Sequence, residues 1–193
     1  MRALTCACLP ICLIAIASPT WGQDVLSVAQ GNWAGASNAG FYFRAELSRA
    51  GDAARLRIWH DLAGVPAGGD AQFDNAEIAP GAFATLQTLQ VLDSADGPAL
   101  QVVTEFADEE AEGREVLTIR FLDNQFTVTG YAHQSLIYNV GGAAVNFACD
   151  LDLWNGTGVV DGVAVALPAM DFEEKNASLW VYGTAFDQGL CVG

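Results

Sequence analysis

Apolar and polar residues alternate along much of this chain. In the clearest example, residues 145–154, every second position is apolar: Val145, Phe147, Cys149, Leu151 and Leu153. Alternation with a period of two is typical of a β-strand that buries one face and exposes the other. The pattern therefore predicts strands that turn one face toward a shared apolar interior.

This strand is the first half of a predicted hairpin. Asn155-Gly156 follows directly, and both residue types tolerate the positive φ angles of a two-residue type I′ turn. The return strand is predicted over Thr157–Leu167, with Asp161 facing inward. A buried carboxylate requires a polar partner, so we expect one at Asp161.

The same alternation predicts strands elsewhere in the chain, at 41–48, 55–60, 85–92, 100–106, 116–122, 126–132, 136–140 and 178–186. Leucines at helical spacing compete with the strand pattern over 85–92, but strands on both sides favour a strand there. The last segment, 178–186, is apolar on both faces and is expected to be covered on both sides. About 8–10 strands joined by short turns predict an all-β fold, an antiparallel up-and-down β-barrel, with a β-sandwich as the alternative.

The segments between these strands supply the predicted turns and loops. Gln23–Gln30 is interpreted as a short lead-in, and Asp123-Asn124 as a second two-residue turn. Asp61–Ala82 is the least regular region and is rich in Gly, Pro, Ala and Asp. Long loops inside compact domains are often functional, so this region is a candidate interaction loop.

The N-terminus has the pattern of a secretory signal peptide. Arg2 precedes an apolar run over Leu9–Ala17, which is too short to span a bilayer. Small residues allow cleavage after Ala17 or after Gly22, and the second site leaves a polar mature terminus. We therefore predict a leader over 1–22, a single domain over 23–193, and export to the periplasm or the extracellular space.

Cysteine usage agrees with export. Three of the five cysteines lie inside the predicted leader, which leaves Cys149 and Cys191. A pair of cysteines in an exported chain predicts one disulfide, which here closes a long loop. We expect this bond to have a structural role.

The charge balance narrows the choice of partners. The chain has 23 acidic and 8 basic residues and a formal net charge of −15. Because nucleic acids and anionic membranes are bound by clustered Lys and Arg, neither is a predicted partner. The scattered acids favour a role in solubility over an attraction for a cationic partner or a divalent metal.

Three residues near the mature N-terminus carry a family resemblance. Gly31-Asn32-Trp33 resembles the Gly-x-Trp motif that opens lipocalins and other calycin-like small β-barrels. The resemblance implies a structural role for Trp33 and a ligand cavity at the open end of a barrel. It extends to periplasmic protease inhibitors, which combine Gly-x-Trp with a single disulfide in a shorter chain.

Catalytic and metal-binding residues are sparse. His60 is followed by Asp61, but adjacent strand residues point to opposite faces, and no nucleophile motif accompanies them. His60 and His133 do not by themselves supply the ligands of a zinc site. Asp150 and Asp152 share one strand face, where a solvated surface is favoured over Ca²⁺ binding. We predict no catalytic residue, no metal and no cofactor.

Aromatic side chains are the candidate ligand contacts, because aromatic groups commonly line pockets for apolar ligands. We select Trp59, Tyr131, Trp180 and Tyr182. The leading hypothesis is a non-catalytic exported barrel that binds a small apolar ligand or a protein. The alternatives are a periplasmic inhibitor or interaction module acting through residues 61–82, and an enzyme.

Overall fold

The computed structural model describes residues 24–35, 40–94, 97–138 and 143–192. The predicted leader and both of its cleavage sites lie outside these residues. Within them almost all of the regular secondary structure is β-strand, as the alternation predicts. The described residues contain no helix long and apolar enough to cross a membrane.

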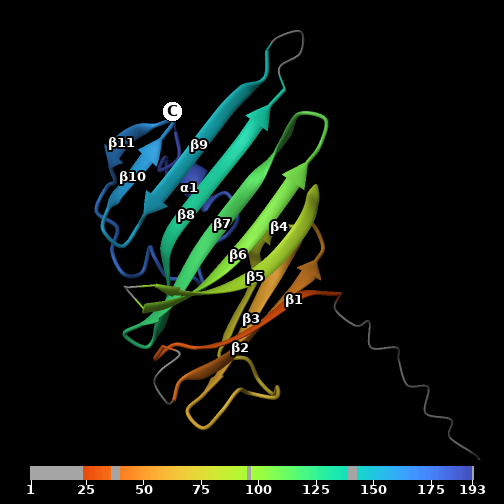
Figure 1. The fold of residues 1–193 in the computed structure, drawn as a ribbon, viewed down its shortest axis with the longest axis vertical. Coiled ribbons are helices and arrows are strands. Elements are labelled where there is room, and N and C mark those ends of the chain that lie inside the picture. Colours follow the sequence, from red (N-terminus) through yellow and green to blue (C-terminus); the bar gives the residue numbers. More distant parts are fainter. Residues whose placement is uncertain (1–23, 36–39, 95–96, 139–142, 193) are drawn as a thin grey trace, which may run out of the picture.

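The strands form two antiparallel sheets in which neighbours in sequence are neighbours in space. The smaller sheet contains β1 (Val25–Asn32), β2 (Tyr42–Ala50), β3 (Ala53–Asp61) and β4 (Phe73–Pro80). The larger sheet contains β5 (Ala84–Ser94), β6 (Gly97–Ala107), β7 (Ala111–Leu122), β8 (Gln125–Ile137), β9 (Val145–Asp152), β10 (Thr157–Val160) and β11 (Val163–Ala166). In Figure 1 the small sheet lies below the large one, and the C-terminal segment runs behind the large sheet.

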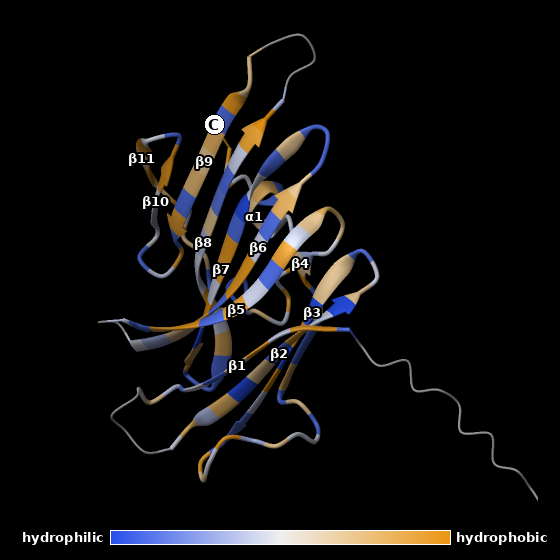
Figure 2. Ribbon diagram, turned by 45° about the vertical axis from the view of Figure 1, so that its right-hand side comes forward, coloured by the Kyte–Doolittle hydropathy of each residue, from blue (hydrophilic) through white to orange (hydrophobic). Residues whose placement is uncertain are grey.

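The core lies where the inner faces of the two sheets meet. Figure 2 shows the strands banded with apolar and polar residues, which is the alternation seen in the sequence. One contiguous cluster joins side chains of both sheets, and its fully buried members include Phe43, Leu56, Ile58, Leu117 and Ile119. The interior between the sheets is therefore occupied by side chains.

The two sheets do not close into a barrel, so the prediction of a closed up-and-down barrel is wrong. On one side β1 lies against β5, where the Leu89 amide donates a hydrogen bond to the Ser27 hydroxyl oxygen. On the other side the C-terminal segment joins the sheets. Its Ala177 amide donates to the carbonyl of Phe126 in β8, and its Tyr182 amide donates to the carbonyl of Glu77 in β4. The arrangement is consistent with the alternative β-sandwich.

The hairpin that begins at β9 differs from its prediction in two ways. Thr157 pairs with Asp152, so the connecting loop contains four residues and not the two of Asn155-Gly156. The return strand is also broken, because Asp161 (φ 48°) and Gly162 (φ 79°) form a turn between β10 and β11. Asp161 is thus exposed at a turn rather than buried, and its carboxylate accepts a hydrogen bond from the Ala148 amide.

The structure confirms one further predicted turn and corrects two predicted loop regions. Asp123 and Asn124 have φ angles of 49° and 63° and link the pair Leu122–Gln125, which confirms the predicted two-residue turn. The lead-in over 23–30 is wrong, because β1 occupies most of it, and the irregular region 61–82 contains β4.

The last predicted strand, over 178–186, is also wrong. This segment consists of turns followed by the short helix α1 (Thr184–Asp187). Gly183 has a φ of 89°, and the Thr184 hydroxyl bonds back to the carbonyl of Val181, so the chain is folded on itself here. Trp180 is buried, but Leu179, Val181, Tyr182 and Phe186 are exposed, so the expectation that this segment is covered on both sides is wrong as well.

A disulfide fastens this cap to the large sheet. Cys149 of β9 is bonded to Cys191, 42 residues further along the chain, as the sequence predicts. Both cysteines are buried in the core cluster. The bond ties the C-terminal segment to the sheet that it covers.

Removal of this bond is expected to destabilise the fold. Replacing both cysteines by serine should lower the free energy of unfolding by about 2–4 kcal/mol, because the unfolded chain regains the entropy of a long open loop. Urea unfolding followed by tryptophan fluorescence measures the change. The unsubstituted protein in reductant should match the double variant, and equal stability of all three samples would contradict a structural role for the bond.

Candidate ligand-binding site

The four aromatic residues selected from the sequence do not gather in one place. Trp59 lies on the outer face of the small sheet, between the guanidinium groups of Arg44 (5.1 Å) and Arg57 (5.3 Å). Its indole N–H donates a 2.8 Å hydrogen bond to the carbonyl of Gly69, which holds the β3–β4 loop over the ring. Glu46 bridges both arginines, with carboxylate oxygens 2.8 Å from Arg44 and 2.5 Å from Arg57.

Two of the others meet inside the molecule. The rings of Tyr131 and Trp180 are 6.2 Å apart, and both side chains are buried beneath the C-terminal cap. Tyr182 is half-exposed on the cap. Tyr131 and Trp180 thus contribute to core packing, Trp59 supports a loop, and their assignment as ligand contacts stays a prediction.

A different group of aromatic residues lines an open depression of about 400 Å³ beside the β7–β8 turn. Trp33, Phe41 and Phe121 form its walls, and the β7–β8 turn, Asp123-Asn124, forms its rim. Trp33 stacks on Phe43 at a centroid distance of 4.1 Å, which fixes the indole plane. We refer to this site as the aromatic depression.

Unusual backbone geometry supports the aromatic depression. Phe41 has a φ of 58°, a left-handed conformation that is strained for a bulky side chain. Its carbonyl accepts a 3.0 Å hydrogen bond from the Trp33 amide, which holds the two wall residues together. Residues in such conformations cluster at functional sites, where the surrounding structure maintains the strain.

Two polar atoms near the aromatic depression have no hydrogen-bond partner among the described residues. One is Nε1 of Trp33, whose side chain is 9% exposed, and the other is Nδ1 of His60. The His60 ring is packed between Phe121 (5.0 Å) and Phe126 (5.9 Å). Both nitrogen atoms are buried, and a buried donor without a partner costs about 1–3 kcal/mol.

Sequence reasoning gave Trp33 a structural role and did not select Phe41 or Phe121. The structural role of Trp33 agrees with its stacking in the core, but Trp33 also forms a wall of the depression. Phe41 is separated from Trp33 in sequence, and Phe121 comes from the other sheet. The only sequence signal near Phe121 is the turn Asp123-Asn124, which places it at the end of a strand.

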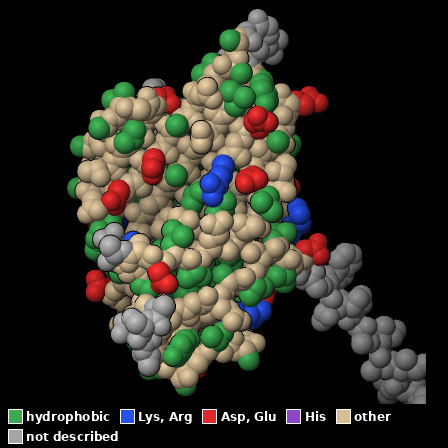
Figure 3. All heavy atoms as spheres, in the orientation of Figure 1, with side chains coloured by type: hydrophobic (Ala, Val, Ile, Leu, Met, Phe, Trp, Pro, Cys, Tyr) green, Lys and Arg blue, Asp and Glu red, His purple; other side chains and the backbone are tan. Residues whose placement is uncertain are grey.

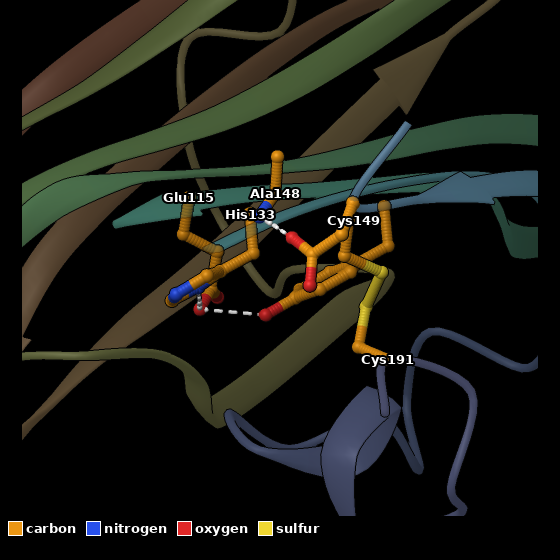
Figure 4. The surroundings of a disulfide bond; sticks show 7 residues. Glu115, His133, Ala148, Cys149 and Cys191 are labelled. Carbon is orange, nitrogen blue, oxygen red and sulfur yellow. Dashed lines mark hydrogen bonds and ion pairs between the residues drawn. A yellow bond between two sulfur atoms is a disulfide. The ribbon is translucent and has the colours of Figure 1, made fainter. Parts of the chain in front are cut away.

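A second cluster joins His133 to a carboxylate on the inner face of the large sheet. The Tyr131 hydroxyl donates a 3.0 Å hydrogen bond to Glu115, and Nδ1 of His133 lies 3.8 Å from the same oxygen. Figure 4 shows Glu115 and His133 side by side, close to the disulfide. Burial raises the pKa of the Tyr131 hydroxyl far above its usual range, and the adjacent Glu115 carboxylate raises it further.

The side chains of this cluster are largely shielded from solvent, which limits their access to a substrate. The Glu115 and His133 side chains are only 12% and 13% exposed, and Phe106 and Phe186 pack against the imidazole ring at 5.5 and 5.0 Å. The strongly raised pKa of Tyr131 keeps its hydroxyl neutral and unreactive as a nucleophile. The arrangement therefore suits a buried polar network rather than an active site.

The remaining candidate residues lie apart from these clusters. Asp150 and Asp152 are exposed on the outer face of β9. The described residues contain no group of three or more His, Cys, Asp or Glu side chains arranged to hold a metal ion.

No family model matches the chain, and no curated protein or solved structure shows significant similarity to it. The likeness of Gly31-Asn32-Trp33 to lipocalins therefore stays a prediction.

The Tyr131–Glu115 contact predicts a dependence of stability on pH. Tyr131→Phe leaves the buried carboxylate without its donor and should lower the free energy of unfolding by about 1–3 kcal/mol at pH 8. The raised pKa stabilises the fold fully below the pKa of an unfolded tyrosine, about 10, and this contribution falls as pH rises above it. The difference between the variant and the wild type should therefore shrink by up to about 1.4 kcal/mol per pH unit above pH 10.

Urea titrations at pH 8, 10 and 11 measure this difference. Tyr182→Phe, on the exposed part of the cap, is the matched control and should leave stability unchanged at pH 8. A constant difference between Tyr131→Phe and wild type across the series would contradict the buried hydrogen bond.

Proposed function

We propose that this chain is an exported, non-catalytic binding protein that takes a small, planar, apolar ligand into the aromatic depression. Three aromatic side chains from two sheets line the depression, and its volume of about 400 Å³ suits a ligand of one or two fused rings. The observation that carries the proposal is the gathering of Trp33, Phe41 and Phe121 around one open depression. The indole N–H of Trp33 is buried and has no partner among the described residues, so a ligand that displaces the side chains covering it would supply an acceptor through a carbonyl or a ring nitrogen.

Export is part of the proposal. The charge and apolar pattern of residues 1–22 and the Cys149–Cys191 disulfide support a periplasmic or extracellular location. Acidic side chains lie scattered over the face seen in Figure 3, which suits a dissolved, exported protein.

A pair of matched probes tests the ligand class. Isothermal titration calorimetry with 2-acetylnaphthalene and 2-ethylnaphthalene compares two molecules of similar shape, of which only the first has a carbonyl acceptor. The wild type should bind both probes and prefer 2-acetylnaphthalene by about fivefold, the value of one hydrogen bond near 1 kcal/mol. Trp33→Phe keeps an aromatic wall without the N–H and should abolish that preference.

Two further variants locate the binding. Phe121→Ala should weaken both probes at least tenfold, because it removes a wall of the aromatic depression. Trp154→Ala, at a half-exposed tryptophan outside the depression, should leave both affinities unchanged. Failure of either probe to bind the wild type, or equal binding by wild type and Phe121→Ala, would exclude the depression as the ligand site.

The β3–β4 loop favours a second candidate function, that of an inhibitor or interaction module acting through residues 61–82. Leu62 and Val65 are 67% and 44% exposed on this loop, and Trp59 and Gln72 anchor it to β3 by hydrogen bonds. An anchored loop with exposed apolar side chains loses little entropy when it docks into a partner.

Protease inhibition assays test this second candidate. A metalloprotease, a serine protease and a cysteine protease serve as probes for the intact protein. Leu62→Ser combined with Val65→Ser should weaken inhibition at least tenfold, whereas Phe83→Ser, at an equally exposed phenylalanine in the β4–β5 turn, should not. Absence of inhibition of all three proteases by the wild type would exclude an inhibitor of these classes.

A further inference from the structure

The outer edge of β11 is the feature that carries an inference beyond ligand binding. The other strand edges are covered, since β1 and β5 lie against each other and the C-terminal cap bonds to β4. No described segment pairs with the free side of β11, which ends the large sheet. An uncovered edge strand is a template for another extended chain.

The hydrogen-bonding groups of this edge follow from its register. Val160 pairs with Val163 across the two-residue turn, and the Leu167 amide donates to the carbonyl of Gly156. Because main-chain groups alternate between the two sides of a strand, residues 163, 165 and 167 face β10. Ala164 and Ala166 therefore direct their N–H and C=O groups away from the sheet.

The side chains of this edge do not block pairing. β11 consists of Val163, Ala164, Val165 and Ala166, and contains none of the charged residues, prolines or bulges that protect edge strands. Val163 is 64% exposed, and Val159 on β10 is 44% exposed. A hollow of about 430 Å³, open on the outer face of β7–β9, reaches the hairpin at Val159 and Gly162.

The charge around the edge is strongly one-sided. Residues 145–166, which form β9, β10, β11 and their turns, contain no Lys or Arg, but contain Asp150, Asp152 and Asp161. Asp161 lies in the turn at one end of β11, and Asp171 follows its other end in sequence. The one basic side chain in the wall of the nearby hollow, Arg114, comes from β7.

We infer that β11 accepts an extended segment of a basic partner protein, which adds an antiparallel strand to the large sheet. The main-chain groups of Ala164 and Ala166 supply the hydrogen bonds, and the acidic surroundings select Lys or Arg in the added segment. In this mode of recognition main-chain pairing gives affinity and neighbouring side chains give specificity. The inference is independent of the ligand in the aromatic depression.

A second copy of this chain fits the edge less well. Pairing β11 with β11 would bring together two copies of a molecule with a net charge of −15, with the Asp161 turns of both copies near the contact. Like charges opposed across an interface reduce affinity and slow association. The charge balance therefore favours a basic partner over self-association.

Nuclear magnetic resonance with a designed peptide tests the inference. The probe is acetyl-Thr-Lys-Val-Lys-Val-Lys-Thr-amide, and its comparison replaces each Lys with Glu. The basic peptide should shift the amide signals of Ala164 and Ala166 and slow their hydrogen exchange at least tenfold. The acidic peptide should bind at least tenfold more weakly.

One variant pair separates main-chain pairing from side-chain contact. Ala164→Pro removes an outward N–H without breaking a bond to β10 and should abolish binding, whereas Ala164→Val keeps the N–H and should bind as the wild type does. A peptide N-methylated at alternate residues should not bind the wild type, and this result does not depend on the folding of Ala164→Pro.

Three results would overturn the inference: unchanged Ala164 and Ala166 signals, equal affinity for the basic and acidic peptides, or concentration-dependent dimerisation that Ala164→Pro removes. The last result would assign the edge to a second copy.

Discussion

Burial of one apolar face from each sheet is the interaction on which this structure depends. Phe43, Leu56 and Ile58 of the small sheet and Leu117 and Ile119 of the large sheet are completely or almost completely buried in one cluster. Each side chain of this size gains about 1.5–3 kcal/mol when it leaves water. Because these side chains fill the space between the sheets, the ligand site that we propose lies at the margin of the core rather than at its centre.

The margin of the core beside the β7–β8 turn is lined by aromatic side chains. There Trp33, Phe41 and Phe121 close the core, and a left-handed backbone at Phe41 holds one of these rings at the surface. Rings cover a large apolar area with few atoms, but they leave the nitrogens of Trp33 and His60 without partners in the described structure. The same packing that seals the core thus leaves two buried nitrogen atoms without a hydrogen bond among the described residues.

The two open sides between the sheets are covered by different elements. β1 and β5 shield one side, and a disulfide-bonded cap fills the other, where Asn75 donates to two of its carbonyls. No described segment pairs with the edge at β11, and β9, β10 and β11 carry acidic but no basic side chains. Strand edges that remain open in a soluble protein either carry protection against aggregation or serve a partner, and here the charge supplies part of that protection.

The sequence by itself determined the local features of this protein. Alternation predicted most of the strands. Asp123-Asn124 predicted a turn because both residues accept positive φ, and the two cysteines outside the predicted leader, Cys149 and Cys191, predicted the disulfide. Only the tertiary structure decided that the strands form two open sheets and not a closed barrel. Alternation indicates which face of a strand is buried, but not which element covers that face. The same limit explains residues 178–186, which form turns and a short helix with only Trp180 of their large apolar side chains buried, and the aromatic depression, whose walls come from β7 and from residues beside β1 and β2. Contacts between residues so distant in sequence leave no periodic signal, so only the packing of the two sheets brings them together.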